Sequence, residues 1–279
     1  MTTTDSRLHT DRFPRSNQYH PDWIIAAASS GAHTLWVTEW LTEALDLKPG
    51  MRVLDLGCGR GMSSVFLRRE FGVQVWAVDL WFSVQENLQR IRDAGFDDGV
   101  FPLHADARTL PFAPEFFDAI VSIDSFPYYG TDDTYLNYLA RLVKPGGVIA
   151  MAGAGLLREF EGSVPPALQA WWEPSMECLH SPGWWRRHWQ KTGIVDIERA
   201  DAMPDGWKFW LQWQRVIAPG NAAEIQAVEA DQGNWLGYLR VVSRRRAAAK
   251  LEEPVVSLTM TYEPHPLLRG GRPPDGTAK

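Results

Sequence analysis

Residues 53–61 read Val-Leu-Asp-Leu-Gly-Cys-Gly-Arg-Gly, an apolar run that continues directly into three glycines spaced two apart. This pattern predicts a buried strand followed by a tight turn that opens a helix. A second apolar run, Val73 to Val78, ends on the carboxylate of Asp79. That acid follows Gly57 by about 20 residues, the distance at which an acid meets ribose hydroxyls in nucleotide-binding βαβ units. The two segments predict a nucleotide-type ligand held over the carboxyl ends of a parallel sheet.

Strand and helix patterns alternate up to residue 151. One helix is predicted over 23–45, ahead of the glycine turn. The expected strands are 51–56, 73–78, 100–104, 117–123 and 148–151, and the expected helices between them are 61–71, 81–94 and 135–142. This alternation predicts an α/β fold with a doubly wound, mostly parallel sheet, whose right-handed crossovers place the loops after the strands along one edge.

The second half of the chain is rich in tryptophan. Eight of the 14 tryptophans fall between Trp171 and Trp213. A proline-rich stretch at 156–182 and two helical patterns at 205–217 and 221–231 predict a helical cap over the sheet edge. A helix at 183–191 and strands at 194–200 and 235–242 complete the expected elements.

These patterns suggest four parts of the chain. Residues 1–50 form an N-terminal lid and first helix, and residues 51–155 form the ligand-binding core. Residues 156–245 hold the rest of the core with cap insertions at 156–182 and 202–233. Residues 246–279 are a C-terminal extension, whose Gly- and Pro-rich tail is expected to be disordered.

Composition narrows the class of protein. The formal net charge of −6 argues against nucleic acid as a partner. The two cysteines, Cys58 and Cys178, suggest a reducing compartment, because one of them lies in the glycine turn. Apolar runs are too short for a membrane span, and the polar N-terminus does not resemble a signal peptide. We therefore expect a cytoplasmic protein, a monomer or homodimer without stable membrane association and without a metal site.

The glycine spacing helps to choose the nucleotide. A nicotinamide enzyme would be expected to carry Gly-x-Gly-x-x-Gly, whereas here Gly57, Gly59 and Gly61 are separated by single residues. Asp55 lies just before the first glycine. A carboxylate beneath the turn would repel a pyrophosphate but attract the positive amino group and sulfonium of S-adenosylmethionine (SAM). The pattern favours SAM.

Five segments then resemble, in order and spacing, successive motifs of the class I SAM-dependent methyltransferases. They are residues 53–61, Asp79, His104-Ala-Asp-Ala107, Phe117-Asp-Ala-Ile-Val121 and Leu142-Val-Lys-Pro-Gly-Gly147. The resemblance covers residues 51–151, and the chain is similar in style to bacterial small-molecule methyltransferases of the ubiquinone-biosynthesis and cyclopropane-synthase-like type. It implies a Rossmann-like sheet of seven strands, with residues 235–242 as the antiparallel seventh strand.

The resemblance also implies site residues. Asp55, Gly57, Cys58 and Gly59 would line the methionine part of SAM, and Asp79 would accept from both ribose hydroxyls. The adenine would lie beside Leu80, Trp81, Asp106 and Ala107. Asp124 and Ser125 would lie between the methionine end and the acceptor.

The acceptor side carries weaker signals. An oxygen, nitrogen or carbon acceptor can need a base, and the candidates are His180, Tyr128 and Tyr129. Six further residues could line the acceptor pocket: Tyr19, His33, Trp36, Glu173, Trp184 and Trp185. An aromatic pocket of this kind could hold a planar acceptor or a cationic amine, although the tryptophans could equally serve core packing.

Three alternatives stay open. Ser125-Phe126-Pro127-Tyr128 is comparable with the Pro-Pro-Tyr motif of amino-methyltransferases, including DNA enzymes, but no basic patch supports nucleic acid. Because no clear base is visible, the chain could also bind SAM or a nucleoside without transferring a methyl group. A remote alternative is an NAD-dependent oxidoreductase. The main expectation is a SAM-dependent methyltransferase of a small molecule.

Overall fold

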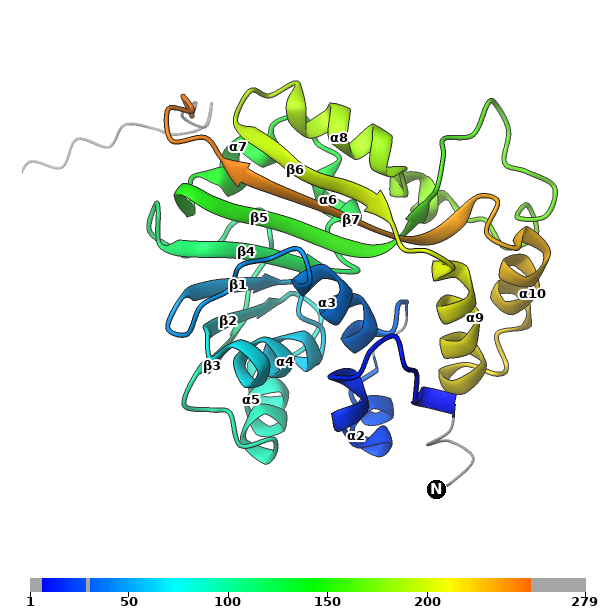
Figure 1. Cartoon of the computed structure of the whole chain (residues 1–279), viewed down its shortest axis with the longest axis horizontal. Helices are drawn as coiled ribbons and strands as arrows, with labels where there is room; N and C mark the ends of the chain where they lie inside the picture. The colour runs from blue at the N-terminus through cyan, green and yellow to red at the C-terminus, as the bar shows by residue number, and fades with distance from the viewer. Residues whose placement is uncertain (1–6, 29–30, 252–279) are drawn as a thin grey trace, which may run out of the picture.

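The structure is a computed structural model that describes residues 7–28 and 31–251. Within these ranges one sheet of seven strands runs through the molecule in the order β3-β2-β1-β4-β5-β7-β6 (Figure 1). The strands are β1 (Arg52–Leu56), β2 (Gln74–Asp79), β3 (Val100–His104), β4 (Phe117–Ile123), β5 (Val143–Leu156), β6 (Val195–Ala202) and β7 (Leu236–Arg245). Strands β1 to β5 pair in parallel, and β7 is antiparallel to both of its neighbours. The α/β class and the antiparallel seventh strand are confirmed.

Strand β5 is longer than the sequence predicted. It begins at Val143, which pairs with Phe117, and it ends at Leu156, which pairs with Leu236 of β7. Residues 144–147, which precede the strand expected at 148–151, are therefore part of β5, with a register shift against β4. The extension beyond Met151 has a physical reason, because β7 pairs with β5 as far as Leu156.

Helices cover both faces of the sheet. Helices α3 (Thr34–Thr42), α4 (Met62–Phe71) and α5 (Val84–Asp93) contribute to one core, and α6 (Pro127–Gly130), α7 (Tyr135–Ala140) and α8 (Pro182–Gln190) to the other. Strand residues alternate between the two: Val53 and Val121 point into the first core, Leu54 and Ile120 into the second. This alternation produces the three-layer arrangement.

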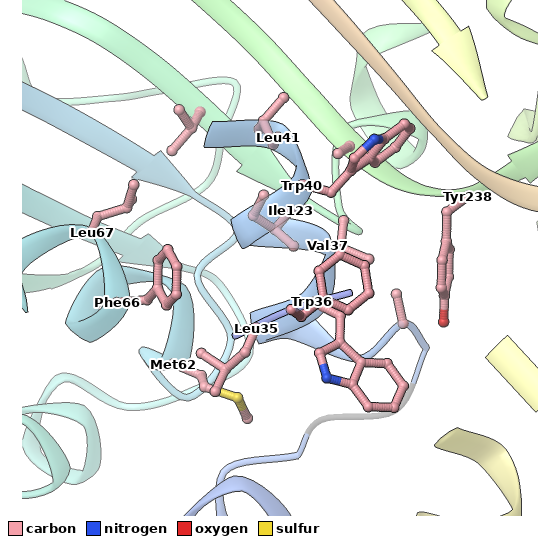
Figure 2. Close-up of a cluster of buried hydrophobic side chains, with 14 of the residues drawn as sticks. Leu35, Trp36, Val37, Trp40, Leu41, Met62, Phe66, Leu67, Ile123 and Tyr238 are labelled. Atoms are coloured by element: carbon pink, nitrogen blue, oxygen red, sulfur yellow. The ribbon is translucent and has the colours of Figure 1, made fainter. Parts of the chain in front are cut away.

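The first core is built around α3 (Figure 2). Every residue from Leu35 to Thr42 is buried. The side chains of Trp36, Trp40 and Leu41 lie among residues of α4, β4 and β7, and each such large apolar side chain contributes about 1.5–3 kcal/mol on burial. Because α3 is buried on every side, it needs cover from the sheet, from α4 and from the N-terminal segment.

The single helix expected over 23–45 is wrong. The structure has α2 (Pro21–Ala26) and then α3. Gly31 has a left-handed φ of 73°, and the Nδ1 atom of His33 accepts a hydrogen bond of 3.3 Å from the N–H of Trp36. Because a side-chain acceptor at this position caps a helix, a new helix starts after His33.

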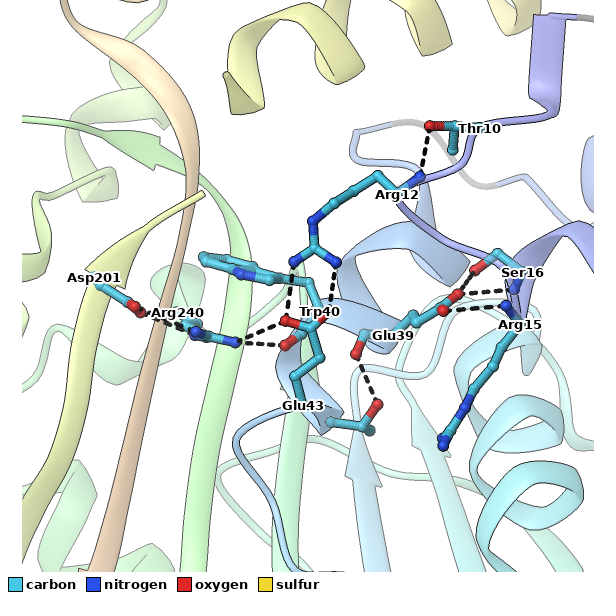
Figure 3. A network of polar contacts seen from close by, with 10 residues as sticks. Thr10, Arg12, Arg15, Ser16, Glu39, Trp40, Glu43, Asp201 and Arg240 are labelled. Carbon is cyan, nitrogen blue, oxygen red and sulfur yellow. Dashed lines mark hydrogen bonds and ion pairs between the residues drawn. The ribbon is translucent and has the colours of Figure 1, made fainter. Parts of the chain in front are cut away.

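Carboxylates in and just after α3 anchor the N-terminal segment, which includes a short 3-10 helix η1 (Ser16–Gln18) (Figure 3). The buried carboxylate of Glu39 accepts from the N–H and the hydroxyl of Ser16, at 2.8 and 2.7 Å. Glu43 pairs with Arg12 and lies 3.9 Å from Arg240 of β7. These contacts tie the N-terminal segment, α3 and the sheet together.

The connection between β6 and β7 forms most of the expected cap. It contains α9 (Gly206–Ile217) and α10 (Ala222–Asp231), which Figure 1 shows beyond one end of the strands, beside the N-terminal segment. The ring of Phe13 meets that of Phe209 in α9 at 5.2 Å. Residues 157–181 are largely irregular and include a 3-10 helix, η2 (Pro174–Cys178).

Other expectations have a mixed outcome. The boundaries of the four parts of the chain remain predictions, and the tail beyond residue 251 lies outside the described residues. Both cysteines are free. Across the described ranges, every helix is too short or too polar to cross a lipid bilayer.

Candidate donor cavity and acceptor side

A cavity of about 320 Å³ lies where β1, β2 and β4 end. Gly57 and Cys58 follow β1, Leu80 follows β2, and Asp124 follows β4. This is the carboxyl edge of the parallel strands, where open α/β sheets bind ligands. Ten of the eleven residues expected to bind SAM line it: Gly57, Cys58, Gly59, Asp79, Leu80, Trp81, Asp106, Ala107, Asp124 and Ser125.

The glycine turn passes very close to its neighbours. The N–H of Gly57 donates to the carbonyl of Val78 at 2.8 Å, and the φ angle of Gly57 is 75°. A Cβ atom on Gly57 would lie 2.0 Å from the hydroxyl of Ser125. A left-handed backbone and this close approach both require glycine.

Asp79 holds the turn against the loop after β2. One oxygen accepts from the N–H of Gly59 at 2.8 Å, and the other accepts from the N–H groups of Trp81 and Phe82 at 2.7 and 3.1 Å. A carboxylate offers about four acceptor positions. Asp79 therefore retains capacity for a hydroxyl donor from a ligand in the cavity.

The loops around the expected adenine region are also held together. His104 Nε2 is hydrogen-bonded to the carbonyl of Leu80 at 2.7 Å, and Asp106 accepts from the N–H of Arg108 at 2.8 Å. The side chain of Trp81 is largely exposed, with 78% of its surface accessible. An exposed indole at a cavity wall offers an apolar surface to a flat ligand.

Asp55 does not line the cavity, contrary to expectation. It is fully buried beneath the turn, and its Oδ2 accepts from the hydroxyls of Ser63 and Ser64, both at 2.6 Å. Burial raises the pKa of Asp55 to about 6. Its influence on the cavity passes through Ser63, which does line it.

Tyrosine and serine hydroxyls gather at the part of the cavity wall that Ser125, Tyr128 and Tyr129 form. The hydroxyl of Tyr129 lies 2.9 Å from that of Ser122 and donates to the carbonyl of Leu56 at 3.3 Å. Burial raises the pKa of Tyr129 above its ordinary value and raises that of Tyr128 to about 12. Both phenols keep their proton at neutral pH, so neither is a ready base.

This geometry agrees with comparisons to known proteins. Residues 53–147 match the family model described as a methyltransferase domain. Together with the sheet order and the cavity, this match supports a class I SAM-dependent methyltransferase domain over these residues. The methyltransferase GfsG of Streptomyces halstedii is 37% identical over 133 residues, which are 47% of each chain. The glycine/sarcosine/dimethylglycine N-methyltransferase of Actinopolyspora halophila is 27% identical over 162 residues, 56% of this chain and 28% of that protein.

Solved structures support the same fold. A geranyl diphosphate C-methyltransferase from Streptomyces coelicolor, crystallised with S-adenosyl-L-homocysteine, has a TM-score of 0.61 at 21% identity over 75% of this chain and 79% of that one. A putative sarcosine dimethylglycine methyltransferase from Galdieria sulphuraria has a TM-score of 0.63 at 21% identity, over 75% and 85%. The chain spans about half or less of the length of the two curated relatives, GfsG and the glycine/sarcosine/dimethylglycine N-methyltransferase. The matched region therefore points to the methyltransferase domain and not to the acceptor.

His180 lies outside the cavity of the methyltransferase domain, contrary to expectation. Its ring stacks on Trp184 with centroids 3.7 Å apart, and its Nδ1 lies 3.0 Å from a carboxylate oxygen of Glu159. Burial opposes the charge of Glu159, but hydrogen bonds from His180 and Ser181 hold the pKa of this carboxyl below its ordinary value. Within the described residues, these partners keep His180 away from the cavity wall.

None of the six residues expected in the acceptor pocket lines the described cavity. Tyr19 packs on Phe66 and donates to Glu70 at 3.2 Å. Glu173 is exposed at the start of η2. Tyr19 is therefore held by contacts outside the cavity, and Glu173 faces solvent.

The other four belong to aromatic packing. His33 stacks on Trp36 at 3.9 Å in the first core, and burial lowers the pKa of His33 to about 3. Trp185 is fully buried in the second core, 4.9 Å from Trp184. The structure thus places Trp36, Trp184 and Trp185 in aromatic packing.

Sequence reasoning missed nine lining residues. Several flank the recognised motifs and could have been inferred from their neighbours, but Gly31 and Thr34 come from the N-terminal segment and carry no local signal. The nine are Gly31, Thr34, Leu56, Ser63, Val78, Phe82, Ala105, Arg108 and Ile123.

Proposed function

We propose that this chain transfers the methyl group of SAM to a nitrogen, oxygen or carbon atom of a small-molecule acceptor. One observation carries the proposal: the carboxylate of Asp79 joins the glycine turn to the loop after β2 and keeps an acceptor position in the cavity. A nucleoside with free ribose hydroxyls suits this arrangement.

The cavity offers partners for each part of the donor. Asp79 would accept from the ribose, and Asp106 would accept from the adenine amino group beside Trp81. Gly57 and Gly59 would leave room for the methionine end. The carboxylates of Asp79, Asp106 and Asp124 among the lining residues favour a positively charged ligand over a pyrophosphate.

Bound SAM supplies a methyl group on a positive sulfonium, already activated for in-line displacement. The protein then has to align the acceptor and exclude water. Ser125, Tyr128 and Tyr129 would do this on the acceptor side, because they line the cavity while both phenols stay protonated. We assign them to orientation rather than to proton removal.

The relatives named above include a glycine/sarcosine N-methyltransferase and the structural neighbours a geranyl diphosphate C-methyltransferase. We further propose a cytoplasmic, bacterial-type enzyme, a monomer or homodimer that acts on a free small molecule and not on nucleic acid. The net charge of −6 supports this choice of partner.

Calorimetry tests the donor. SAM and S-adenosylhomocysteine should bind with one site per chain, and NAD should give no heat of binding. Binding of NAD without SAM would favour the oxidoreductase alternative and overturn the proposal.

A second assay separates an enzyme from a binding protein. The purified chain is incubated with SAM and with pools of amines, hydroxyl compounds or activated carbon acids, and formation of S-adenosylhomocysteine is measured. We expect one pool to raise this rate. SAM binding without turnover in any pool would favour a non-catalytic SAM-binding protein.

A further inference from the structure

One carboxylate joins the N-terminal segment to the end of β4. Oδ2 of Asp124 accepts a hydrogen bond of 2.6 Å from the N–H of Ala32, and Oδ1 accepts one of 2.9 Å from the N–H of Ala154 in β5. Ala32 itself is buried, and its neighbours Gly31 and Thr34 line the cavity together with Asp124. One wall of the cavity is thus formed by a segment 92 residues away in sequence from the carboxylate that holds it.

The fit around Asp124 is tight. A Cβ atom on Gly31 would lie 2.0 Å from Oδ2 of Asp124, and a Cβ atom on Gly153 would lie 2.8 Å from its Oδ1. Asp124 itself has a φ of 55°, an unfavourable conformation for a residue with a side chain. Strain of this kind persists only where the surroundings determine it, and it often marks a functional position.

A second contact holds the same segment from the cap. The side-chain amide of the buried Gln214 in α9 donates to the carbonyl of Gly31 at 3.0 Å. Gly31 is therefore attached to the cap, while Ala32 is attached to the sheet. The segment at 31–34 cannot shift without breaking one of these hydrogen bonds.

We infer that Asp124 is a positioning residue, which fixes the wall formed by Gly31 and Thr34 and so sets the shape of the donor cavity. This inference rests on the proposed function for its consequence, which is donor affinity. The role acts through the two backbone N–H groups from which Asp124 accepts, and it requires no direct contact with SAM.

The test compares Asp124→Asn with Asp118→Asn. Both acids belong to or follow β4, and both accept from a backbone N–H, but Asp118 accepts from Arg52 at the opposite end of the strand. An asparagine at 124 would present an N–H group to one of the two backbone N–H groups. We expect the Ala32 amide to exchange its hydrogen about tenfold faster or more, and S-adenosylhomocysteine to bind about tenfold more weakly. Asp118→Asn should leave both quantities near the wild-type values.

A second pair of variants moves the wall without changing Asp124. Gly31→Ala and Gly50→Ala both replace a glycine of positive φ, 73° and 83°, but only the Cβ atom at position 31 meets a neighbour within 4 Å. We expect Gly31→Ala to weaken donor binding and Gly50→Ala to leave it unchanged, with both chains folded by circular dichroism.

Two results would overturn the inference. One is an unchanged exchange rate of the Ala32 amide in Asp124→Asn; the other is faster exchange with unchanged donor affinity in both Asp124→Asn and Gly31→Ala. If the wild-type chain binds neither SAM nor S-adenosylhomocysteine, the proposed function fails instead. The exchange rate of the Ala32 amide then still decides whether Asp124 holds the wall.

Discussion

The hydroxyl of Ser63 donates a hydrogen bond of 2.6 Å to the buried carboxylate of Asp55. Ser63 lines the donor cavity, whereas Asp55 lies beneath it. Asp55 therefore acts on the cavity through the start of α4 and not by direct contact. Since burial raises its pKa to about 6, the charge of this group has consequences for stability.

Asp55 should make the free energy of unfolding depend on pH. Its ordinary pKa is 3.8 and its folded pKa about 6, so the folded state binds the proton more tightly. Its contribution to stability is present below about pH 4 and is lost as the pH rises to about 6, by about 3 kcal/mol. Relative to wild type, Asp55→Asn should become more stable over this window in urea denaturation.

His33 acts in the opposite direction and provides the control. Burial lowers the pKa of His33 to about 3. Its contribution to the free energy of unfolding is therefore fully present above its ordinary pKa of 6.5 and is lost as the pH falls toward 3. As the pH rises, the free energy of unfolding of His33→Asn should therefore fall relative to that of wild type, the opposite of the trend expected for Asp55→Asn. If the free energies of unfolding of wild type and Asp55→Asn differ by the same amount from pH 4 to 6, Asp55 is ionised in the folded state over this range, which would contradict the prediction.

Gly57→Ala should damage the donor site directly. The new Cβ atom would lie 2.0 Å from the hydroxyl of Ser125, and overpacking of this kind costs about 1–3 kcal/mol. Affinity for S-adenosylhomocysteine, measured by calorimetry, should fall about tenfold or more. Gly95→Ala is the matched control, because Gly95 also has a positive φ but nothing lies within 4 Å of its Cβ position. Equal effects of the two variants would mean that backbone strain, not crowding of the cavity, is responsible.

Asp79→Asn should weaken SAM binding by about 2–3 kcal/mol, because a charged acceptor is lost. The variant also disturbs the hydrogen bonds to Gly59 and Trp81, so the thermal midpoint should be measured beside the affinity. Asp98→Asn removes an exposed acid paired with Arg68 and should change neither quantity strongly. Wild-type affinity in Asp79→Asn would remove Asp79 from the donor site.

His180→Ala should leave the affinity for S-adenosylhomocysteine unchanged. The ring of His180 is occupied by Trp184 and Glu159, outside the cavity wall. The variant should instead lower the thermal midpoint, since a stacked ring and a hydrogen bond are lost. A large fall in donor affinity without loss of stability would return His180 to the site.

The core of the fold could be predicted because its signals are local. The strand at 53–56, the glycine turn and Asp79 are read within a short stretch of sequence, and parallel pairing then brings their ends to one edge. The same reasoning placed ten of eleven donor residues at the cavity. Asp55 is the exception, since the sequence shows that it precedes the turn but not that its side chain points away from the ligand.

The packing of the residues expected in the acceptor pocket, and the cavity wall at Gly31, could not be predicted because they depend on distant segments. Trp185 is fully buried against Phe126, at 5.8 Å between ring centroids, while its neighbour Trp184 stacks on His180. Nothing in the local pattern separates these two roles. Gly31 reaches the cavity only because Asp124 and Gln214 hold the segment around it.

A crystal structure of the chain with S-adenosylhomocysteine is the most direct test of the account. We predict that the ligand occupies the cavity between the glycine turn and Asp106, with a ribose hydroxyl donating to the carboxylate of Asp79. Ligand bound at another surface, or ligand in this cavity without contact to Asp79, would contradict the central claim.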